Sequence, residues 1–250
     1  MRFLDDASRE AIRQRLGEGG NQVTLHVFIQ DDEQAENGQA QTISKDTVDL
    51  MEELAEAAGN IRVRVYEPDQ DMHVFTHYGI TEVPTVMPMA ERDEGIRFVG
   101  LPHGYEFASL LDTVAAMRND EEPEVSPELL ERLAELRGPT NLKVFYTPTC
   151  PHCPRAVRNA IQLARASDQI TVELIEALQF PHLRQTYQVF AVPRTVINDI
   201  AVFDGAGTVD DVVSHIIAAH RGEGFEEQQE EIRRRMEEAA RQQEADGRVD

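Results

Sequence analysis

The chain contains the octapeptide Thr147-Pro-Thr-Cys-Pro-His-Cys-Pro154 between a predicted strand, Leu142–Tyr146, and a helix predicted over Cys150–Ala166. A Cys-x-x-Cys spacing at a helix start can bring two sulfur atoms within bonding distance. The free N–H groups and the positive end of the helix also favour a thiolate over a thiol. The thiolate pKa in such motifs falls to about 3.5–7, from ~8.5 for a free cysteine. The octapeptide therefore predicts a redox-active cysteine pair.

The two cysteines are predicted to have different roles. Cys150, at the predicted N-cap, is the attacking and more exposed thiol, and Cys153, one turn further on, is the resolving thiol. Pro151 takes the first helical position, where its missing N–H costs nothing. Pro154 lacks the N–H that would bond the Cys150 carbonyl, which loosens the first turn. His152 is either a spacer or, as we favour, a donor that stabilises the Cys150 thiolate and makes the disulfide more oxidising.

A structural zinc site is the main alternative for the cysteine pair. Zinc would need two more ligands, usually a second pair of Cys or His residues. The chain has no further cysteine, and His182, the one histidine nearby in sequence, stands beside Pro181 with no second histidine next to it. We therefore predict no metal site.

The composition excludes two classes of partner. The chain has 46 acidic and 24 basic residues, a formal net charge of −22. A field of that sign repels phosphate backbones and anionic lipid, so neither nucleic acid nor a membrane is an expected partner. The first residues, Met1 to Asp6, become charged at once and resemble no secretory signal. We expect a cytoplasmic protein, where a structural disulfide framework is rare.

The predicted elements repeat in one order, which indicates an α/β chain of two tandem units. The expected units are residues 1–119 and 120–221, each a central mixed sheet flanked by helices, followed by a charged tail, 222–250, that is helical or disordered. Both units carry a Val-Pro pair ahead of a strand, at Val83-Pro84 and Val192-Pro193. The other predicted helices are Asp6–Leu16, Ser44–Ala58, a short one that leads to Gly79, Tyr105–Met117, one from Ser126, one from Pro181 and Val209–His220. The other predicted strands are Val23–Ile29, Ile61–Tyr66, Ile96–Val99, Ile170–Ile175 and Ala201–Phe203.

These features resemble the thioredoxin superfamily: Cys-x-x-Cys after a strand, a helix, then Val-Pro ahead of a hairpin. In that family the proline is cis and packs against the cysteines, so the resemblance implies cis bonds at Pro84 and Pro193. Two units with Cys-Pro-His-Cys-Pro in the second are similar to the glutaredoxin-like protein disulfide oxidoreductases. A similar tandem unit stands at the N-terminus of flavoproteins that reduce alkyl hydroperoxide reductase. The resemblance covers roughly residues 1–220.

The resemblance implies thiol–disulfide exchange with protein or small-thiol substrates and no cofactor beyond the redox-active disulfide. The expected partners are disulfide-containing proteins and an unidentified reductant, such as a thioredoxin reductase-like flavoprotein. Substrate contacts are implied for the residues around the cysteines and the second proline: Thr149, Pro151, Val192 and Pro193.

One departure from the family pattern concerns the first unit. The equivalent of Cys150 falls near Asp31-Asp-Glu-Gln34, which has no cysteine, so the first unit is predicted to be redox-inactive. Two other functions stay open. A redox-inert binding or adaptor module would show an ordinary pKa for Cys150. A glutathione-linked glutaredoxin would show glutathione-dependent turnover.

Overall fold

The computed structural model of the chain describes residues 3–17, 19–30, 38–136 and 138–223, and five further residues at 230, 233, 234, 237 and 241. It divides into two compact units, Met1–Pro123 and Glu124–Asp250. Most of the predicted tail, and the segment near Asp31 expected to match Cys150, lie outside the described residues. No described helix is both long and apolar enough to cross a membrane.

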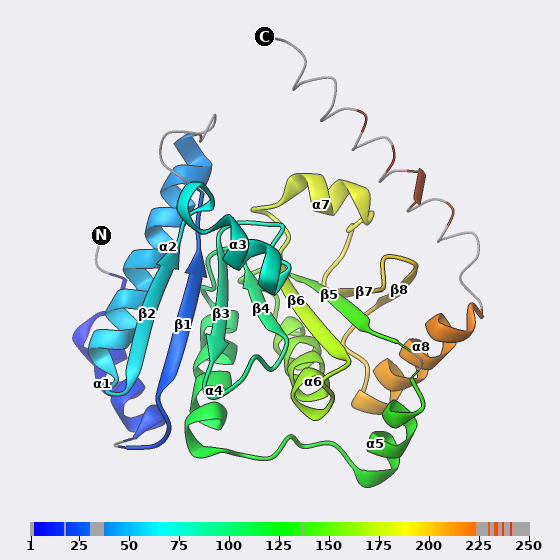
Figure 1. The fold of residues 1–250 in the computed structure, drawn as a ribbon, viewed down its shortest axis with the longest axis horizontal. Coiled ribbons are helices and arrows are strands. Elements are labelled where there is room, and N and C mark those ends of the chain that lie inside the picture. The colour runs from blue at the N-terminus through cyan, green and yellow to red at the C-terminus, as the bar shows by residue number, and fades with distance from the viewer. Residues whose placement is uncertain are drawn as a thin grey trace. The chain divides into compact units, whose positions relative to one another are not determined.

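The first unit is built on four strands in the order β2-β1-β3-β4 (Figure 1). Strand β1 pairs in parallel with β2 and antiparallel with β3, and β3 pairs antiparallel with β4. Helix α2 packs against β1 and β2, and α4 packs against β1 and β3. The elements are α1 (Asp6–Leu16), β1 (Val23–Phe28), α2 (Gly38–Ala57), β2 (Ile61–Tyr66), α3 (Pro68–Tyr78), β3 (Thr85–Met89), β4 (Ile96–Val99) and α4 (Tyr105–Asn119).

The second unit has the equivalent strand order, β6-β5-β7-β8. Strand β5 pairs in parallel with β6 and antiparallel with β7, and β7 pairs antiparallel with β8. The elements are α5 (Pro127–Ala134), β5 (Thr140–Tyr146), α6 (Cys153–Ala166), β6 (Ile170–Glu176), α7 (Pro181–Thr186), β7 (Arg194–Ile197), β8 (Ala201–Asp204) and α8 (Val209–Arg221). The predicted α/β class with mixed sheets is therefore confirmed.

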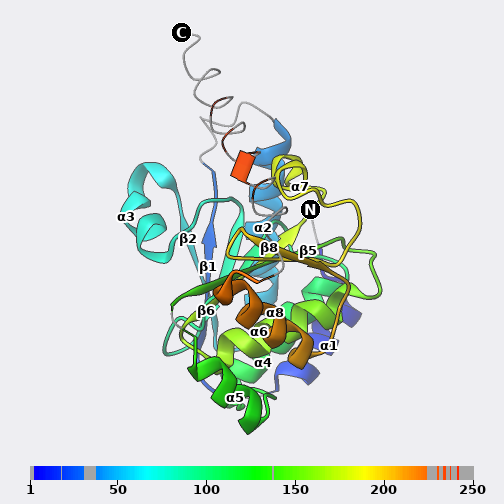
Figure 2. The same ribbon diagram turned by 90° about the vertical axis from the view of Figure 1, so that its right-hand side faces the viewer.

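Helix α6 owes its position to its apolar face. It packs against β5 and β6, while α8 packs against α6 and β8 (Figure 2). Val157 and Leu163 of α6 are fully buried, as are Val144 and Phe145 of β5. Burying such side chains stabilises the unit by about 1.5–3 kcal/mol each. This packing holds the first turn of α6 beside the end of β5.

Both predicted cis bonds are confirmed: Val83-Pro84 and Val192-Pro193 are cis. Each proline precedes a strand, β3 or β7. The Pro84 carbonyl accepts a hydrogen bond at 2.8 Å from the N–H of Gly100, which directly follows β4. The Pro193 carbonyl accepts one at 2.9 Å from the N–H of Gly205, which directly follows β8. The two units therefore have the same turn.

Candidate active site

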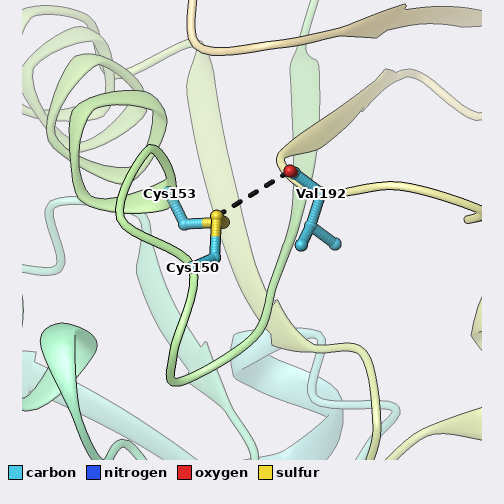
Figure 3. The surroundings of a disulfide bond; sticks show 3 residues. All are labelled: Cys150, Cys153 and Val192. Carbon is cyan, nitrogen blue, oxygen red and sulfur yellow. Dashed lines mark hydrogen bonds between the residues drawn. A yellow bond between two sulfur atoms is a disulfide. The ribbon is translucent and has the colours of Figure 1, made fainter.

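The cysteine loop joins β5 to α6. Strand β5 ends at Tyr146, α6 begins at Cys153, and Cys150 lies in the turn between them. The N–H of Cys150 donates to the Thr147 carbonyl at 3.1 Å, and the N–H of Cys153 donates to the Cys150 carbonyl at 3.4 Å. These bonds hold the two Cα atoms 5.5 Å apart, and the cysteines form a disulfide (Figure 3). The chain is thus described in its oxidised form.

The predicted start of this helix is wrong by two residues. We expected Cys150 at the N-cap and Pro151 in the first helical position, but the N-cap is His152 and the helix begins at Cys153. Pro154 supplies the physical reason. It has no N–H to donate to the Cys150 carbonyl, which instead accepts from Cys153 in a tighter turn.

The two cysteines differ in burial, while their roles as attacking and resolving thiol stay predictions. Cys150 is 9% exposed and Cys153 is fully buried. The residues around Cys150 are open to solvent: Thr149, Pro151 and His152 are all exposed. An incoming sulfur can therefore approach Cys150 from solvent, whereas Cys153 is enclosed by the protein.

The loop that carries the cis bond meets the cysteine loop. The Val192 carbonyl oxygen lies 3.8 Å from Sγ of Cys150, and Figure 3 shows it pointing toward the disulfide. Val192 is half-buried and Pro193 is buried. In the reduced form, the Cys150 thiol could donate a weak hydrogen bond to this carbonyl. The structure thus brings Val192 and the cysteine pair together, while the substrate-binding role of Val192 stays a prediction.

His152 is placed as a neighbour of the disulfide but makes no bond to it. Its side chain is exposed and does not cap the helix. No described group accepts or donates a hydrogen bond at its ring. A thiolate partner exists only after reduction, so the favoured role of His152 stays a prediction about the reduced protein.

Two exposed apolar residues, in the loops that contact the cysteine loop, were not predicted. Phe190, two residues before Val192, is 84% exposed, and Leu178, two residues after β6, is 62% exposed. Arg184 holds the Phe190 loop, since its Nε donates to the Val189 carbonyl at 3.2 Å. No pattern in the sequence distinguishes Phe190, because it sits in an apolar run that resembles a buried strand.

The loop after β6 is held by a buried carboxylate. Glu176 is 1% exposed. Its carboxylate oxygens accept hydrogen bonds from the backbone N–H groups of Leu178 at 3.2 Å and Gln179 at 2.8 Å. These bonds fix the loop that presents Leu178. Among the described residues, no cluster of three or more His, Cys, Asp or Glu side chains could hold a metal ion.

Comparison with known proteins agrees with this geometry. Residues 140–218 match the family model of the thioredoxin domain. An alkyl hydroperoxide reductase component from Xanthomonas campestris pv. phaseoli is 24% identical over 174 residues, 69% of this chain. A protein named NADH dehydrogenase from Bacillus subtilis is 23% identical over 171 residues, 68% of this chain. Each alignment covers only 31% of the relative's length.

Two solved structures resemble most of the chain. A protein disulfide oxidoreductase from Aeropyrum pernix has 26% identity and a TM-score of 0.74, with 89% of this chain and 96% of that chain covered. The NTD_N/C domain of alkylhydroperoxide reductase AhpF from Enterococcus faecalis has 21% identity and a TM-score of 0.74, with 86% and 100% covered. Residues 140–218 thus carry a thioredoxin domain that holds the Cys150–Cys153 disulfide, and the chain is similar in fold to a protein disulfide oxidoreductase.

Proposed function

We propose that this chain exchanges its Cys150–Cys153 dithiol or disulfide with disulfides and dithiols of other proteins. One observation carries the proposal: a closed Cys-x-x-Cys disulfide stands between the end of β5 and the start of α6, beside the cis Val192-Pro193 bond. A purely structural cross-link would not need an open approach to one sulfur. Here the residues flanking Cys150 are exposed while Cys153 is enclosed.

The reaction balances in two steps. The Cys150 thiolate attacks one sulfur of the target disulfide, forms a mixed disulfide, and releases the other target sulfur as a thiolate, which takes up a proton. The Cys153 thiolate then attacks the Cys150 sulfur and releases the second target sulfur. The target gains two electrons and two protons, and the Cys150–Cys153 disulfide closes. The reverse sequence oxidises a dithiol target.

The surrounding residues have proposed roles in this exchange. The start of α6 offers free N–H groups and the positive end of the helix dipole near Cys150, which favours its thiolate. His152, at the N-cap, adds a donor in the reduced form. The residues that would contact the substrate are Thr149, Pro151, Val192 and Pro193.

The proposal includes a reductant and no bound cofactor. A dithiol donor must return Cys150 and Cys153 to the reduced state after each turnover, and a thioredoxin reductase-like flavoprotein is the donor we propose. The curated relatives, one named as a reductase and one as a dehydrogenase, support such a redox system. We propose the cytoplasm as the setting, because its reducing conditions suit a reversible cysteine pair. Neither nucleic acid nor a membrane is a proposed partner.

The first unit is proposed to be redox-inactive, because both cysteines of the chain lie in the second. In this scheme residues 1–119 form the inactive thioredoxin-like unit and residues 120–221 the active one. The tail from residue 222 has no proposed role in the exchange.

Two serine variants test the proposed function. With dithiothreitol as donor and insulin as substrate, Cys150→Ser should reduce insulin no faster than dithiothreitol alone. Cys153→Ser should lose turnover but accumulate a mixed disulfide with the substrate, seen as a mass increase that a reductant reverses. Full insulin reduction by Cys150→Ser would contradict the proposal. An ordinary thiol pKa for Cys150 with no turnover in the unaltered chain would support the redox-inert adaptor instead.

A further inference from the structure

Two segments that meet at the cysteine loop lack acidic residues, although the chain is rich in them and the buried Glu176 directly precedes one of these segments. The segment Thr140–Ser167, from β5 to just past α6, contains four basic residues and no acidic one, and Ala177–Asn198 contains two arginines and no acidic residue. At the average frequency of the chain, 46 acidic residues in 250, the two segments together would carry about nine. The local charge is therefore opposite in sign to the net charge of −22.

The fold brings these two segments together at the disulfide. The Ala177 N–H donates to the Tyr146 carbonyl at 2.9 Å, which joins the loop after β6 to the start of the cysteine loop. The Val192 carbonyl lies 3.8 Å from Sγ of Cys150. The two acid-free segments thus meet at the cysteine loop, and their exposed residues make up the surface next to it.

Three arginines on this surface are available to a partner. Arg155 and Arg158 are exposed on α6, two and five residues after Cys153, so their backbone lies within about 8 Å of it along the helix axis. Arg184 is exposed on α7 and holds the Phe190 loop through the Val189 carbonyl. None of these three forms an ion pair with a described residue.

The other nearby charges are already engaged. Lys143 pairs with Asp199 at 2.8 Å, and Arg194 pairs with Asp204 at 2.9 Å. Asp211, whose pKa is lowered mainly by its hydrogen bonds with Thr208 and in small part by Arg155, uses its carboxylate in the capping of α8. The three arginines therefore keep their capacity to bind an anion.

Large apolar side chains stand on the same surface. Phe190 and Leu178 have the largest exposed fractions among the large apolar side chains of the described residues, at 84% and 62%. Aromatic and arginine side chains are the residue types that most often dominate the binding energy of protein interfaces. Both side chains belong to loops that contact the cysteine loop, so a partner that approaches Cys150 comes close to these loops.

We propose that this surface recognises protein partners whose reacting cysteines are flanked by acidic residues and by a large apolar side chain. The inference rests on the proposed thiol–disulfide exchange and names the substrate class of that site. Acidic residues would meet Arg155, Arg158 and Arg184, and the apolar side chain would meet Phe190. Because the chain as a whole is strongly acidic, an acidic partner is repelled elsewhere and is oriented toward the disulfide.

Matched peptides test this inference. Two peptides of equal length, each closed by one disulfide next to a leucine, would carry either four glutamates or four lysines at the flanking positions. The reduced protein should reduce the glutamate peptide about tenfold faster at 20 mM salt, and 300 mM salt should remove most of that advantage because it screens the charges. The triple variant Arg155→Gln, Arg158→Gln, Arg184→Gln should lose the preference. Phe190→Ser should slow reduction of both peptides.

A control variant lies at the opposite end of β5. His220 Nε2 is 2.8 Å from Oγ1 of Thr140, the first residue of β5, whereas the cysteine loop follows the last residue of that strand. The exposed Arg221 directly follows His220, so Arg221→Gln removes an arginine at the end of β5 opposite to the cysteine loop. It should keep the full preference. The reduction potential of each variant is measured against dithiothreitol. An unchanged potential shows that the variant alters substrate binding and not the cysteine pair.

The outcomes are distinct. Equal rates for the two peptides, or a faster lysine peptide, would overturn the recognition inference while leaving the exchange reaction intact. No reduction of either peptide would overturn the proposed function itself. Glutathione disulfide reduced as fast as the glutamate peptide, with the same loss in the triple variant, would assign the arginines to a small anionic substrate and overturn a protein partner.

Discussion

The two units use the same backbone frame but differ at the end of their central strand. In the first unit, β1 ends at Phe28, which is fully buried. Its ring centre lies 5.0 Å from that of Tyr66, 5.1 Å from that of Phe75 and 6.3 Å from that of Tyr78. In the second unit, the equivalent strand β5 leads directly into the disulfide loop.

The helices next to these sites differ accordingly. Helix α3 has 11 residues and buries Phe75, whereas α7 has six residues and buries none of them. In the loops on either side of α7, Leu178 and Phe190 are exposed. The shared turn at the cis proline therefore does not by itself define a reactive site. The loop sequence after the central strand, and the apolar surface left uncovered beside it, make the difference.

The largest expected effect is a loss of stability of the first unit when Arg118 is replaced. Arg118 is 2% exposed, and its guanidinium donates to the backbone carbonyls of Gly17, Gly19 and Gly59. Arg118→Ala would leave these carbonyls without a charged donor and open a cavity. We expect a loss of about 3 kcal/mol in the free energy of unfolding, measured in urea.

Two further variants sharpen that result. Arg118→Lys should recover only part of the loss, because lysine lacks the planar fork that reaches several acceptors at once. Arg62→Ala, on the exposed side of β2, should change stability by no more than about 0.5 kcal/mol. A loss below about 1 kcal/mol in Arg118→Ala would show that this arginine does not stabilise the first unit.

A smaller effect is expected at the redox site of the second unit. If His152 stabilises the Cys150 thiolate, it favours the reduced dithiol and raises the reduction potential. One charge-assisted hydrogen bond is worth roughly 1.5–3 kcal/mol, and ~30 mV corresponds to about 1.4 kcal/mol for this couple. His152→Ala should therefore lower the potential by about 30–60 mV. His182→Ala, an exposed histidine on α7, is the control; an unchanged potential in His152→Ala would make His152 a spacer.

The smallest expected effect is a dependence of the stability on pH that comes from His26 in the first unit. Burial, and then the charge of Arg64, lowers the pKa of His26, whose Nδ1 is 2.9 Å from the Tyr66 hydroxyl. The folded chain therefore binds fewer protons than the unfolded chain, so stability falls as the pH drops below the unfolded value of about 6.5. The slope from this group cannot exceed about 1.4 kcal/mol per pH unit.

Unfolding in urea at pH 7.5, 6.5 and 5.5 measures this contribution. His26→Phe keeps an aromatic ring on the sheet and removes the titration, so its stability should change less between pH 6.5 and 5.5 than that of the unaltered chain. The exposed His103, replaced by Phe, should leave the slope as it was. Equal slopes in His26→Phe and the unaltered chain would rule out this assignment.

Much of the fold can be predicted from the sequence, because apolar spacing and residue spacing within a short segment determine many of the elements. Alternating apolar residues predict β2, and the Cys-x-x-Cys spacing predicts that the two sulfurs can meet. The cis bonds at Pro84 and Pro193 follow from the family resemblance and not from composition. The N-cap of α6 lies two residues beyond its predicted position, because Pro154 has no N–H to donate to the Cys150 carbonyl, which accepts from Cys153 instead.

Features that depend on distant contacts could not be predicted. The partners of Arg118 lie at Gly17, Gly19 and Gly59, which only the folded unit brings together. The apolar run around Phe190 is typical of a strand, but its segment is a loop that pairs with no strand, and the side chain stays in solvent. Apolar sequence predicts burial only where an element exists to cover it.

The proposed exchange depends on Cys150 being the attacking thiol and Cys153 the resolving one. The most direct test is alkylation of the fully reduced protein at pH 7 with limiting iodoacetamide, followed by peptide mapping over time. Since the thiolate is the reactive species, and Cys150 is the more exposed sulfur next to the positive end of α6, Cys150 should be modified first and faster than a free cysteine. Faster modification of Cys153 would reverse the two roles and contradict the mechanism.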